Sequence, residues 1–212
     1  MDREAWNRRY EGSELIWTAQ PNRFLAAEVA GLSPGRALDL GSGEGRNAVW
    51  LAENGWEVTA VDFSEVGLAK AAKLADERGV FVSWVLADLR DHLPPAGAFD
   101  LTVVLYVHLP AAERRRMLAA AAASVAPGGA LLVVGHDTSN IEEGYGGPQD
   151  PAILFTPEDV AGELPELEIE RAERVRRSAT SPEGEEMEAI DALVRARKPP
   201  PPEPPLRAAA GS

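Results

Sequence analysis

Short apolar segments alternate with longer amphipathic segments through most of the chain. The short segments are rich in Val and Leu and have strand length, whereas apolar residues in the longer segments recur with helical spacing. The predicted strands cover residues 37–40, 57–61, 81–86, 101–105 and 130–134, and the predicted helices cover residues 22–31, 46–54, 65–78 and 111–126. This alternation predicts right-handed crossovers and a parallel sheet covered by helices on both faces.

The two ends of the chain have different patterns. Residues 167–177 and 187–197 have the pattern of strands separated by a turn, which predicts an antiparallel hairpin. Residues 1–20 contain two tryptophans without core periodicity, so we expect a lid that precedes a single domain at residues 21–197. Residues 198–212 are Pro-rich, which predicts a disordered tail.

The composition of the chain narrows the range of possible functions. A net charge of −13 argues against non-specific nucleic-acid binding, which needs clustered Lys and Arg, so a small-molecule substrate is expected. The longest apolar runs are far shorter than the ~20 residues of a membrane span, and no signal-peptide pattern opens the chain. The absence of cysteine is consistent with a reducing, cytoplasmic location. The one basic cluster, residues 114–116, is expected on a solvated helix face.

A glycine-rich turn follows the first predicted strand. Gly41, Gly43 and Gly45 stand between that strand and a helix that begins near Arg46. Glycine lets the backbone approach a ligand closely, and the free amides of a helix start favour a carboxylate, a ribose hydroxyl or a phosphate. The turn therefore predicts a nucleotide-type binding site.

An acid at the end of the second predicted strand fits the same site. Asp62 lies about 20 residues beyond the first glycine, where a Rossmann-type site places the carboxylate that binds the ribose. A dinucleotide and S-adenosylmethionine (SAM) would both suit this acid. Three features favour SAM: Arg46 replaces the third glycine of a dinucleotide fingerprint, Asp39 precedes the turn, and Asp88 ends the third strand.

The order of these motifs closely resembles the class I SAM-dependent methyltransferases over residues 15–195. Residues 43–52 and 6–10, with Trp17 and residues 21–22, are similar to small bacterial enzymes related to the tellurite-resistance, thiopurine and thiol/halide methyltransferases. The resemblance implies a Rossmann-like α/β fold, with a seven-stranded, mostly parallel sheet that the antiparallel hairpin closes. It also implies SAM as cofactor and S-adenosylhomocysteine (SAH) as product.

Each part of SAM has an expected partner. Asp62 should accept from the ribose hydroxyls beside the apolar wall of Phe63, and Asp88 should accept from the adenine amino group. The backbone of residues 41–43 should hold the methionine end, whose carboxylate Arg46 would pair with. The expected cofactor-binding residues are Asp39, Gly41, Ser42, Gly43, Arg46, Asp62, Phe63, Asp88, Leu89, Leu105 and Trp17.

Two histidines are candidates for substrate chemistry. His108 and His136 follow or end the fourth and fifth predicted strands, at the edge where ligands bind in open α/β sheets. Either could act as acid or base, with Asp137 able to orient His136; a structural loop role is the alternative for His108. Tyr106 and Tyr145 are expected to line the substrate site. No metal site is expected, because no third ligand stands at a recognised spacing.

The sequence thus predicts a SAM-dependent methyltransferase acting on a small-molecule acceptor. The narrower resemblance implies a soft S, Se/Te or halide nucleophile, whereas the histidines keep an O nucleophile open. A non-catalytic SAM-binding regulator and an NAD-dependent oxidoreductase of the same fold are the alternatives. The sequence leaves the oligomeric state open between a monomer and a homodimer.

Overall fold

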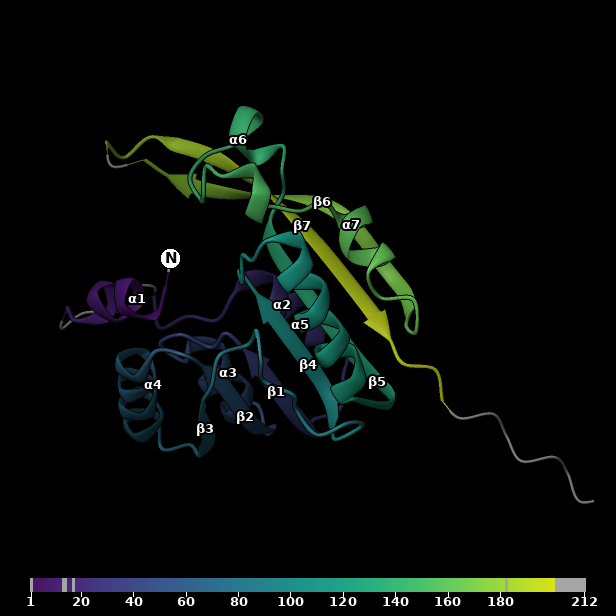
Figure 1. Ribbon diagram of the computed structural model, residues 1–212. Coiled ribbons are helices and arrows are strands. Elements are labelled where there is room, and N and C mark those ends of the chain that lie inside the picture. Colours follow the sequence, from purple (N-terminus) through teal and green to yellow (C-terminus); the bar gives the residue numbers. More distant parts are fainter. Residues whose placement is uncertain (1, 13–14, 17, 182, 201–212) are drawn as a thin grey trace, which may run out of the picture.

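The computed structural model of this 212-residue chain describes residues 2–12, 15–16, 18–181 and 183–200. A seven-stranded sheet has the order β3-β2-β1-β4-β5-β7-β6, in which the first five strands pair in parallel and the last two antiparallel (Figure 1). The predicted fold class is therefore confirmed. The strands are β1 (Arg36–Leu40), β2 (Glu57–Asp62), β3 (Val82–Leu86), β4 (Phe99–Leu105), β5 (Val125–His136), β6 (Glu168–Thr180) and β7 (Glu186–Arg197).

Helices cover both faces of the sheet, because its strands are apolar on both sides. Leu131 and Val133 of β5 belong to one buried cluster with α5 and α7, whereas Leu132 and Val134 belong to another with α2 and α3. The helices are α1 (Arg3–Tyr10), α2 (Arg23–Val29), α3 (Arg46–Glu53), α4 (Glu65–Arg78), α5 (Ala111–Ser124), α6 (Asn140–Glu143) and α7 (Pro157–Gly162), with a 3-10 turn η1 at Pro151–Ile153.

Capping side chains set several helix boundaries. Asn22 accepts from two amides in the first turn of α2, and Ser64 caps α4 in the same way. Gly79, with a φ of 67°, ends α4 in the left-handed region. Thr156 and Asp159 form a reciprocal capping box at the start of α7. These caps explain how α7, which the apolar spacing did not predict, forms at only 6 residues.

The basic cluster in α5 differs from its prediction. Arg114 is buried rather than solvated, with Nη2 2.8 Å from a carboxylate oxygen of Glu163 and its guanidinium over the Phe155 ring. Arg115 is exposed, as expected for a solvated face. The expectation was wrong for Arg114 because α7 packs near this part of α5. Glu163, the residue just after the end of α7, supplies the acid that pairs with Arg114.

The hairpin of β6 and β7 projects beyond the rest of the sheet (Figure 1). Its β7 arm pairs with β5 from Ala130 to His136, so residues near the end of the chain reach the carboxyl end of a central strand. Within the residues that the structure describes, no helix has the length and apolar composition needed to cross a bilayer.

Candidate functional site

The glycine-rich turn joins β1 to α3 at the point where the strand order of the sheet reverses. Because β1 lies between β2 and β4, its carboxyl end is a topological switch point, the usual ligand position in open α/β sheets. Gly41 and Gly45 have φ values of +80° and +79°, and a Cβ atom on Gly41 would lie 2.4 Å from the Val107 side chain. The turn therefore needs glycine for both its conformation and its close packing.

Asp62, the last residue of β2, holds this turn from the neighbouring strand. One carboxylate oxygen accepts from the Gly43 amide at 2.8 Å, and the other accepts from the Ser64 amide at 2.8 Å. Burial raises the pKa of Asp62, and backbone hydrogen bonds from Ser64, Gly43 and Phe63 oppose that shift. Since a carboxylate offers about four lone-pair sites, Asp62 keeps capacity for a ligand hydroxyl beyond these backbone amides.

Polar groups beside the turn are buried with incomplete hydrogen bonding. One Asp39 oxygen and the Ser42 hydroxyl have no hydrogen-bond partner among the described residues. Burial, followed by the nearby Asp62 charge, raises the pKa of Asp39 to about 7. Arg46 is the first residue of α3. Its own burial lowers the pKa of Arg46 overall, and the nearby Asp39 charge acts in the opposite direction. An acid, a hydroxyl and a cation therefore surround the turn.

Asp88 occupies the expected place beyond the end of β3, next to Asp62. The backbone joins the two strand ends, because the Ala87 amide donates to the Asp62 carbonyl at 3.0 Å. The Asp88 side chain is paired within the chain: Arg90 donates to both of its oxygens, at 2.6 Å for the shortest contact. This pairing holds the pKa of Asp88 below its usual value. A ligand at Asp88 would have to displace or share Arg90.

The remaining predicted cofactor residues are apolar. Phe63 and Leu89 are partly buried on the loops after β2 and β3, and Leu105 is buried at the end of β4. Leu89 also lies beside the turn, 3.6 Å from where a Cβ on Gly41 would stand. Trp17 lies outside the described residues.

The N-terminal segment is bound to the glycine turn and its neighbours. The Tyr10 hydroxyl lies against Gly43, where an added Cβ would approach it to 2.8 Å. Glu44, within the turn, is buried and pairs with Lys70 at 2.9 Å. Three hydrogen bonds tie the segment down: Ser64 Oγ to Asn7 Oδ1 at 2.6 Å, the Ile16 amide to Glu44 Oε2 at 2.9 Å, and the Asn22 amide to Asn47 Oδ1 at 2.8 Å.

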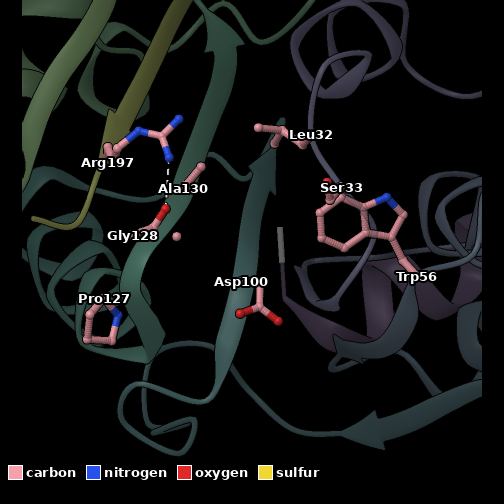
Figure 2. A pocket seen from close by; sticks show the side chains of 9 residues that line it. Leu32, Ser33, Trp56, Asp100, Pro127, Gly128, Ala130 and Arg197 are labelled. Atoms are coloured by element: carbon pink, nitrogen blue, oxygen red, sulfur yellow. Dashed lines mark hydrogen bonds between the residues drawn. The ribbon is translucent and has the colours of Figure 1, made fainter. Parts of the chain in front are cut away.

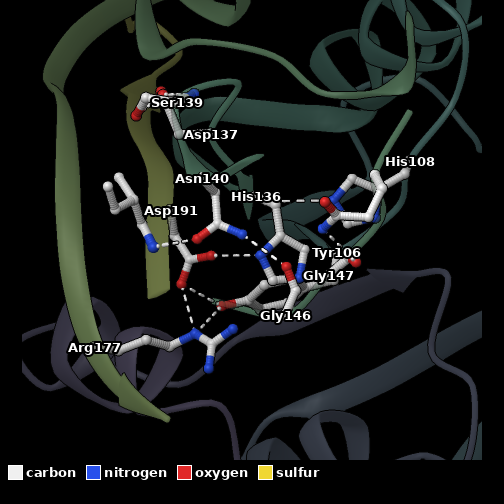
Figure 3. Close-up of polar contacts among 12 residues, drawn as sticks. Tyr106, His108, His136, Asp137, Ser139, Asn140, Gly146, Gly147, Arg177 and Asp191 are labelled. Atoms are coloured by element: carbon white, nitrogen blue, oxygen red, sulfur yellow. Dashed lines mark hydrogen bonds and ion pairs between the residues drawn. The ribbon is translucent and has the colours of Figure 1, made fainter. Parts of the chain in front are cut away.

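Two histidines and a tyrosine meet at the carboxyl ends of β4 and β5 (Figure 3). The rings of His108 and His136 stack with centroids 5.3 Å apart and planes 14° apart, and the Tyr106 ring meets His136 edge-on at 5.1 Å. Tyr106 has a φ of 58°, the one positive value at a non-glycine residue in the described part of the chain. Such strained positions concentrate at functional sites.

The His108 ring is hydrogen-bonded to the backbone of two residues. Nε2 accepts from the His136 amide at 3.2 Å, and the ring also hydrogen-bonds to the backbone of Tyr106. Burial and the neighbouring His136 lower the pKa of His108 to about 4. His108 is therefore neutral at physiological pH, and these contacts favour a structural role over proton transfer.

Asp191 of β7 and Arg177 of β6 complete this cluster, and sequence reasoning missed both. Asp191 accepts from the Tyr106 hydroxyl at 2.7 Å and from Arg177 Nε at 2.7 Å. Its other oxygen lies 3.1 Å from His136 Nδ1, which is ion-pair distance without hydrogen-bond geometry. A lone acid within the apolar segment 189–194 was a usable signal for Asp191, whereas Arg177 stands in an Arg-rich strand and carried none.

Asp137 does not orient His136, although the two are adjacent in sequence. It accepts from the Ser139 amide and hydroxyl at 2.9 and 2.8 Å, and from Arg174 Nε at 2.9 Å. Successive side chains of an extended segment point to opposite faces, which separates Asp137 from the histidine cluster.

The loop after α6 covers His136. Asn140 secures this loop by donating to the Gly146 carbonyl at 2.8 Å and accepting from the Ile190 amide at 2.7 Å. Gly147 stands against the imidazole, and a Cβ there would lie 2.7 Å from Nε2 of His136. Tyr145, predicted to line the substrate site, is partly buried in this same loop.

A cavity of about 280 Å³ lies at the opposite edge of the sheet, at the amino ends of β1, β4 and β5 (Figure 2). Two of its polar groups are paired within the chain: Arg197 donates to the Gly128 carbonyl at 2.8 Å, and Asp100 accepts from the Arg36 amide at 2.8 Å. The cavity is separate from the glycine turn, because no residue of the turn lines it. Over the described ranges, no group of three or more potential ligands gathers in a way that could hold a metal ion.

Comparisons with known proteins agree with this geometry. Residues 37–129 match a family model described as a methyltransferase domain. The chain is 35% identical over 125 residues to demethylmenaquinone methyltransferase from Thermus thermophilus, covering 58% of this chain and 55% of that protein. It thus spans about half the length of this curated relative.

Solved structures share the fold along nearly the whole chain. A structure concerned with the conversion of a disulfide bond into a thioacetal group during echinomycin biosynthesis has a TM-score of 0.76 at 21% identity, covering 93% of this chain and 91% of that one. N-methyltransferase NodS from Bradyrhizobium japonicum, in complex with SAH, has a TM-score of 0.70 at 21% identity, covering 93% and 98%.

These matches do not single out the tellurite-resistance, thiopurine and thiol/halide group, so that narrower resemblance stays a prediction. The family match spans the first parallel strands and the glycine turn, and the structural likeness extends through the closing hairpin. Sheet order, glycine turn and sequence similarity agree with one another. The chain has the Rossmann-like methyltransferase fold, and its residues 37–129 match a methyltransferase domain.

Proposed function

We propose that this protein binds SAM at the glycine turn and transfers the methyl group of SAM to a small-molecule acceptor. The observation that carries the proposal is the turn itself, held by Asp62 at the switch point of the sheet. Two proteins to which the chain is similar, a demethylmenaquinone methyltransferase and an N-methyltransferase in complex with SAH, support the same function.

The residues beside the turn match the chemistry of a methionine moiety. Its amino group needs an acceptor and its carboxylate needs a cation, and Asp39 and Arg46 stand on either side of the turn with those properties. Asp62 would accept from the ribose hydroxyls, and Phe63 and Leu105 would supply apolar contact. Asp88 would accept from the adenine amino group once Arg90 shares or leaves it.

The N-terminal segment would act as a lid over the cofactor. Its hydrogen bonds to Ser64, Glu44 and Asn47 attach it to the same elements that surround the turn. SAM, when bound, supplies a sulfonium-activated methyl group, and the protein's own task is to align the acceptor and exclude water. A lid at this position serves the second requirement.

The acceptor would lie at the carboxyl ends of β4 and β5, beside Tyr106, His136 and the loop of Tyr145. The proposal covers acceptors whose nucleophilic atom is S, Se or Te, a halide or O, because enzymes that act on different classes of acceptor share this fold and cofactor motif. The acidic net charge of −13 argues for a small molecule rather than nucleic acid.

Calorimetric titration of the purified chain with SAM, SAH and NAD in parallel tests the proposal. We expect SAM and SAH to bind at one site per chain and NAD to give no heat above dilution. Binding of NAD alone would overturn the assignment and favour an oxidoreductase. Binding of SAM without release of SAH for any acceptor would instead support a SAM-binding regulator.

A further inference from the structure

An acid and a histidine face each other across the two strands that join the parallel sheet to its hairpin. His136 of β5 and Asp191 of β7 are direct partners in the antiparallel register. Directly opposite residues place their side chains on the same face of the sheet, within contact distance. The side chains meet with 3.1 Å between Nδ1 and Oδ1 (Figure 3).

The Asp191 carboxylate is held in its charged form. It is fully buried, and burial alone raises its pKa, but His136, Arg177 and Tyr106 oppose that effect and bring the pKa below its usual value. A charged carboxylate beside Nδ1 of His136 favours the tautomer that carries its proton on Nδ1. The lone pair of the imidazole is then on Nε2.

Nε2 lies beneath the loop that covers this edge of the sheet. The loop approaches it with Gly147, at a φ of +76°, where a Cβ would stand 2.7 Å from the nitrogen. A side chain at this position would fill the space next to Nε2. The neighbouring Gly146 has a similar φ of +74° but has nothing within 4 Å of an added Cβ.

We infer that the acceptor is a hydroxyl compound, that Nε2 of His136 takes its proton, and that Asp191 is the positioning residue for this base. The inference rests on the proposed function, because it requires SAM as the methyl donor. The inference adds the chemical class of the acceptor and the role of Asp191, which acts through His136. Neither follows from the glycine turn.

The chemical balance of this step is complete with SAM as co-reactant. The acceptor oxygen forms a bond to the methyl carbon while the bond from that carbon to sulfur breaks, and the bonding electron pair stays on sulfur. The hydroxyl proton moves to Nε2 of His136. The products are the methyl ether, neutral SAH and a protonated imidazole beside the Asp191 carboxylate, which stabilises that charge.

The pair of His136 and Asp191 would have no role in the methylation of a soft acceptor. A thiolate or a halide is already an unprotonated nucleophile, so a buried histidine oriented by a carboxylate would not be needed. His108 cannot take the same part, because its Nε2 accepts from the His136 amide and the ring also bonds to the Tyr106 backbone.

Several charged and titratable groups lie around His136 on the elements packed near it. They are Asp191 of β7, Arg177 of β6, Tyr106 and His108 after β4, and Arg46 of α3, whose charge acts on Tyr106 and Arg177.

Nitrogen-15 NMR of the SAH complex tests the pairing without any acceptor, because it reports which ring nitrogen of His136 carries the proton. In Asp191→Asn we expect the preference for a proton on Nδ1 to be lost, because the variant removes the carboxylate charge 3.1 Å from that nitrogen. Asp137→Asn is the matched control: it neutralises a buried acid that pairs with an arginine of β6 but does not face His136. The same His136 tautomer in wild type and Asp191→Asn would overturn the positioning role.

Steady-state release of SAH with phenol and with thiophenol tests the acceptor class. Thiophenol ionises near neutral pH and phenol does not, so only phenol needs a base. We expect His136→Gln to lower the phenol-to-thiophenol ratio of kcat by about 100-fold, which is the lower end of the usual base contribution, and Asp191→Asn to lower it by at least about tenfold. KM for phenol should change little in Asp191→Asn.

Gly147→Ala provides a second route that substitutes neither member of the pair. Its methyl group would stand 2.7 Å from Nε2, so the imidazole or the loop must shift, and we expect the phenol-to-thiophenol ratio to fall. Gly146→Ala, with a similar backbone strain and no such contact, should keep the ratio. An equal ratio in both alanine variants would contradict the placement of the acceptor.

The outcomes separate this inference from the proposed function. A wild-type chain that binds SAM and methylates thiophenol but not phenol keeps the proposed function and overturns the inference. So does a chain that binds SAM but shows neither phenol turnover nor a phenol-induced shift of the His136 resonances in the SAH complex. Failure to bind SAM overturns the proposed function, whereas the nitrogen-15 spectrum of the ligand-free chain still reports on Asp191 and His136.

Discussion

At the scale of single residues, buried acids of one type differ in what surrounds them. Asp62 accepts from backbone amides, and Asp191 has the donors Tyr106 and Arg177 on one oxygen and His136 at ion-pair distance from the other. Asp39 keeps one oxygen without a hydrogen-bond partner among the described residues. Buried polar groups are normally hydrogen-bonded, so an incompletely bonded acid beside a glycine turn indicates a place for a ligand. Partners, rather than residue type, distinguish the roles of these acids.

Asp62→Asn tests the ribose contact at this scale. We expect SAM to bind more weakly by about 1.5–3 kcal/mol, roughly 10- to 150-fold, since a hydrogen bond to a charged group is lost. Calorimetry measures this change. Asp100→Asn is the control, because Asp100 pairs with Arg36 at the opposite edge of the sheet and should leave the affinity unchanged. Wild-type affinity in Asp62→Asn would show that the ribose is bound elsewhere.

His108 predicts a pH dependence of stability. Its folded pKa of about 4 is below the ordinary value of 6.5, so the unfolded chain binds more protons between these values. Its contribution is therefore complete above pH 6.5 and is lost as the pH falls towards 4. We expect the difference in unfolding free energy between wild type and His108→Gln to shrink over this range.

Urea unfolding at several pH values measures that difference. Asp39, whose pKa is raised to about 7, contributes the opposite slope, but it is present in both proteins and cancels. A difference that stays constant from pH 7 to pH 4 would mean that His108 titrates normally in the folded chain.

At the scale of elements, the segments around the cofactor site are held by different kinds of contact. Local caps begin α2 and α4, whereas α1 and the segment after it are attached by side-chain contacts to the turn and to Ser64. Such an attachment can release without disturbing the sheet. The N-terminal segment is therefore suited to open and close over a bound cofactor.

Deletion of residues 2–12 tests the lid. We expect the fold to persist, because the sheet and its two main apolar clusters lie outside this segment, and SAM affinity to fall by at least about tenfold. Calorimetry and a thermal unfolding curve measure both effects. Removal of residues 201–211, which is a deletion of equal length at the other end, should change neither. Undiminished SAM affinity after the first deletion would argue against a lid.

At the scale of the whole molecule, stability and function use different edges and faces of one sheet. The glycine turn and histidine cluster lie at the carboxyl ends of the parallel strands, whereas α5 and α7 are joined on one face by the pair of Arg114 and Glu163. This pair is buried, with 6% and 9% of its side-chain surfaces exposed, so removing Arg114 would leave the Glu163 carboxylate with only the exposed Arg115 as its partner.

Arg114→Ala should therefore destabilise the fold by about 3–5 kcal/mol, the usual cost of removing one partner of a buried pair. Arg115→Ala is the matched control from the same helix: its side chain is 66% exposed and also contacts Glu163, so we expect a change of at most about 1 kcal/mol. Chemical denaturation measures both values. Equal effects in the two variants would contradict a special role for burial.

The sequence by itself determined the alternation of strands and helices, the hairpin and the glycine turn with Asp39, Arg46, Asp62 and Asp88. These features could be predicted because each depends on residue spacing within a short stretch of sequence. The signals are apolar periodicity, turn residues and an acid at the end of a strand. The fold class followed from their order. Boundaries shifted by a few residues where caps or pairing extended an element.

Only the tertiary structure decided how the histidine cluster is organised. Asp191 and Arg177 contact Tyr106 across sequence separations of 85 and 71 residues, and the register of β7 against β5 brings Asp191 opposite His136. A one-residue change of that register would turn every side chain of β7 to the other face. Long-range strand pairing, which no local pattern encodes, therefore set the partners of His136.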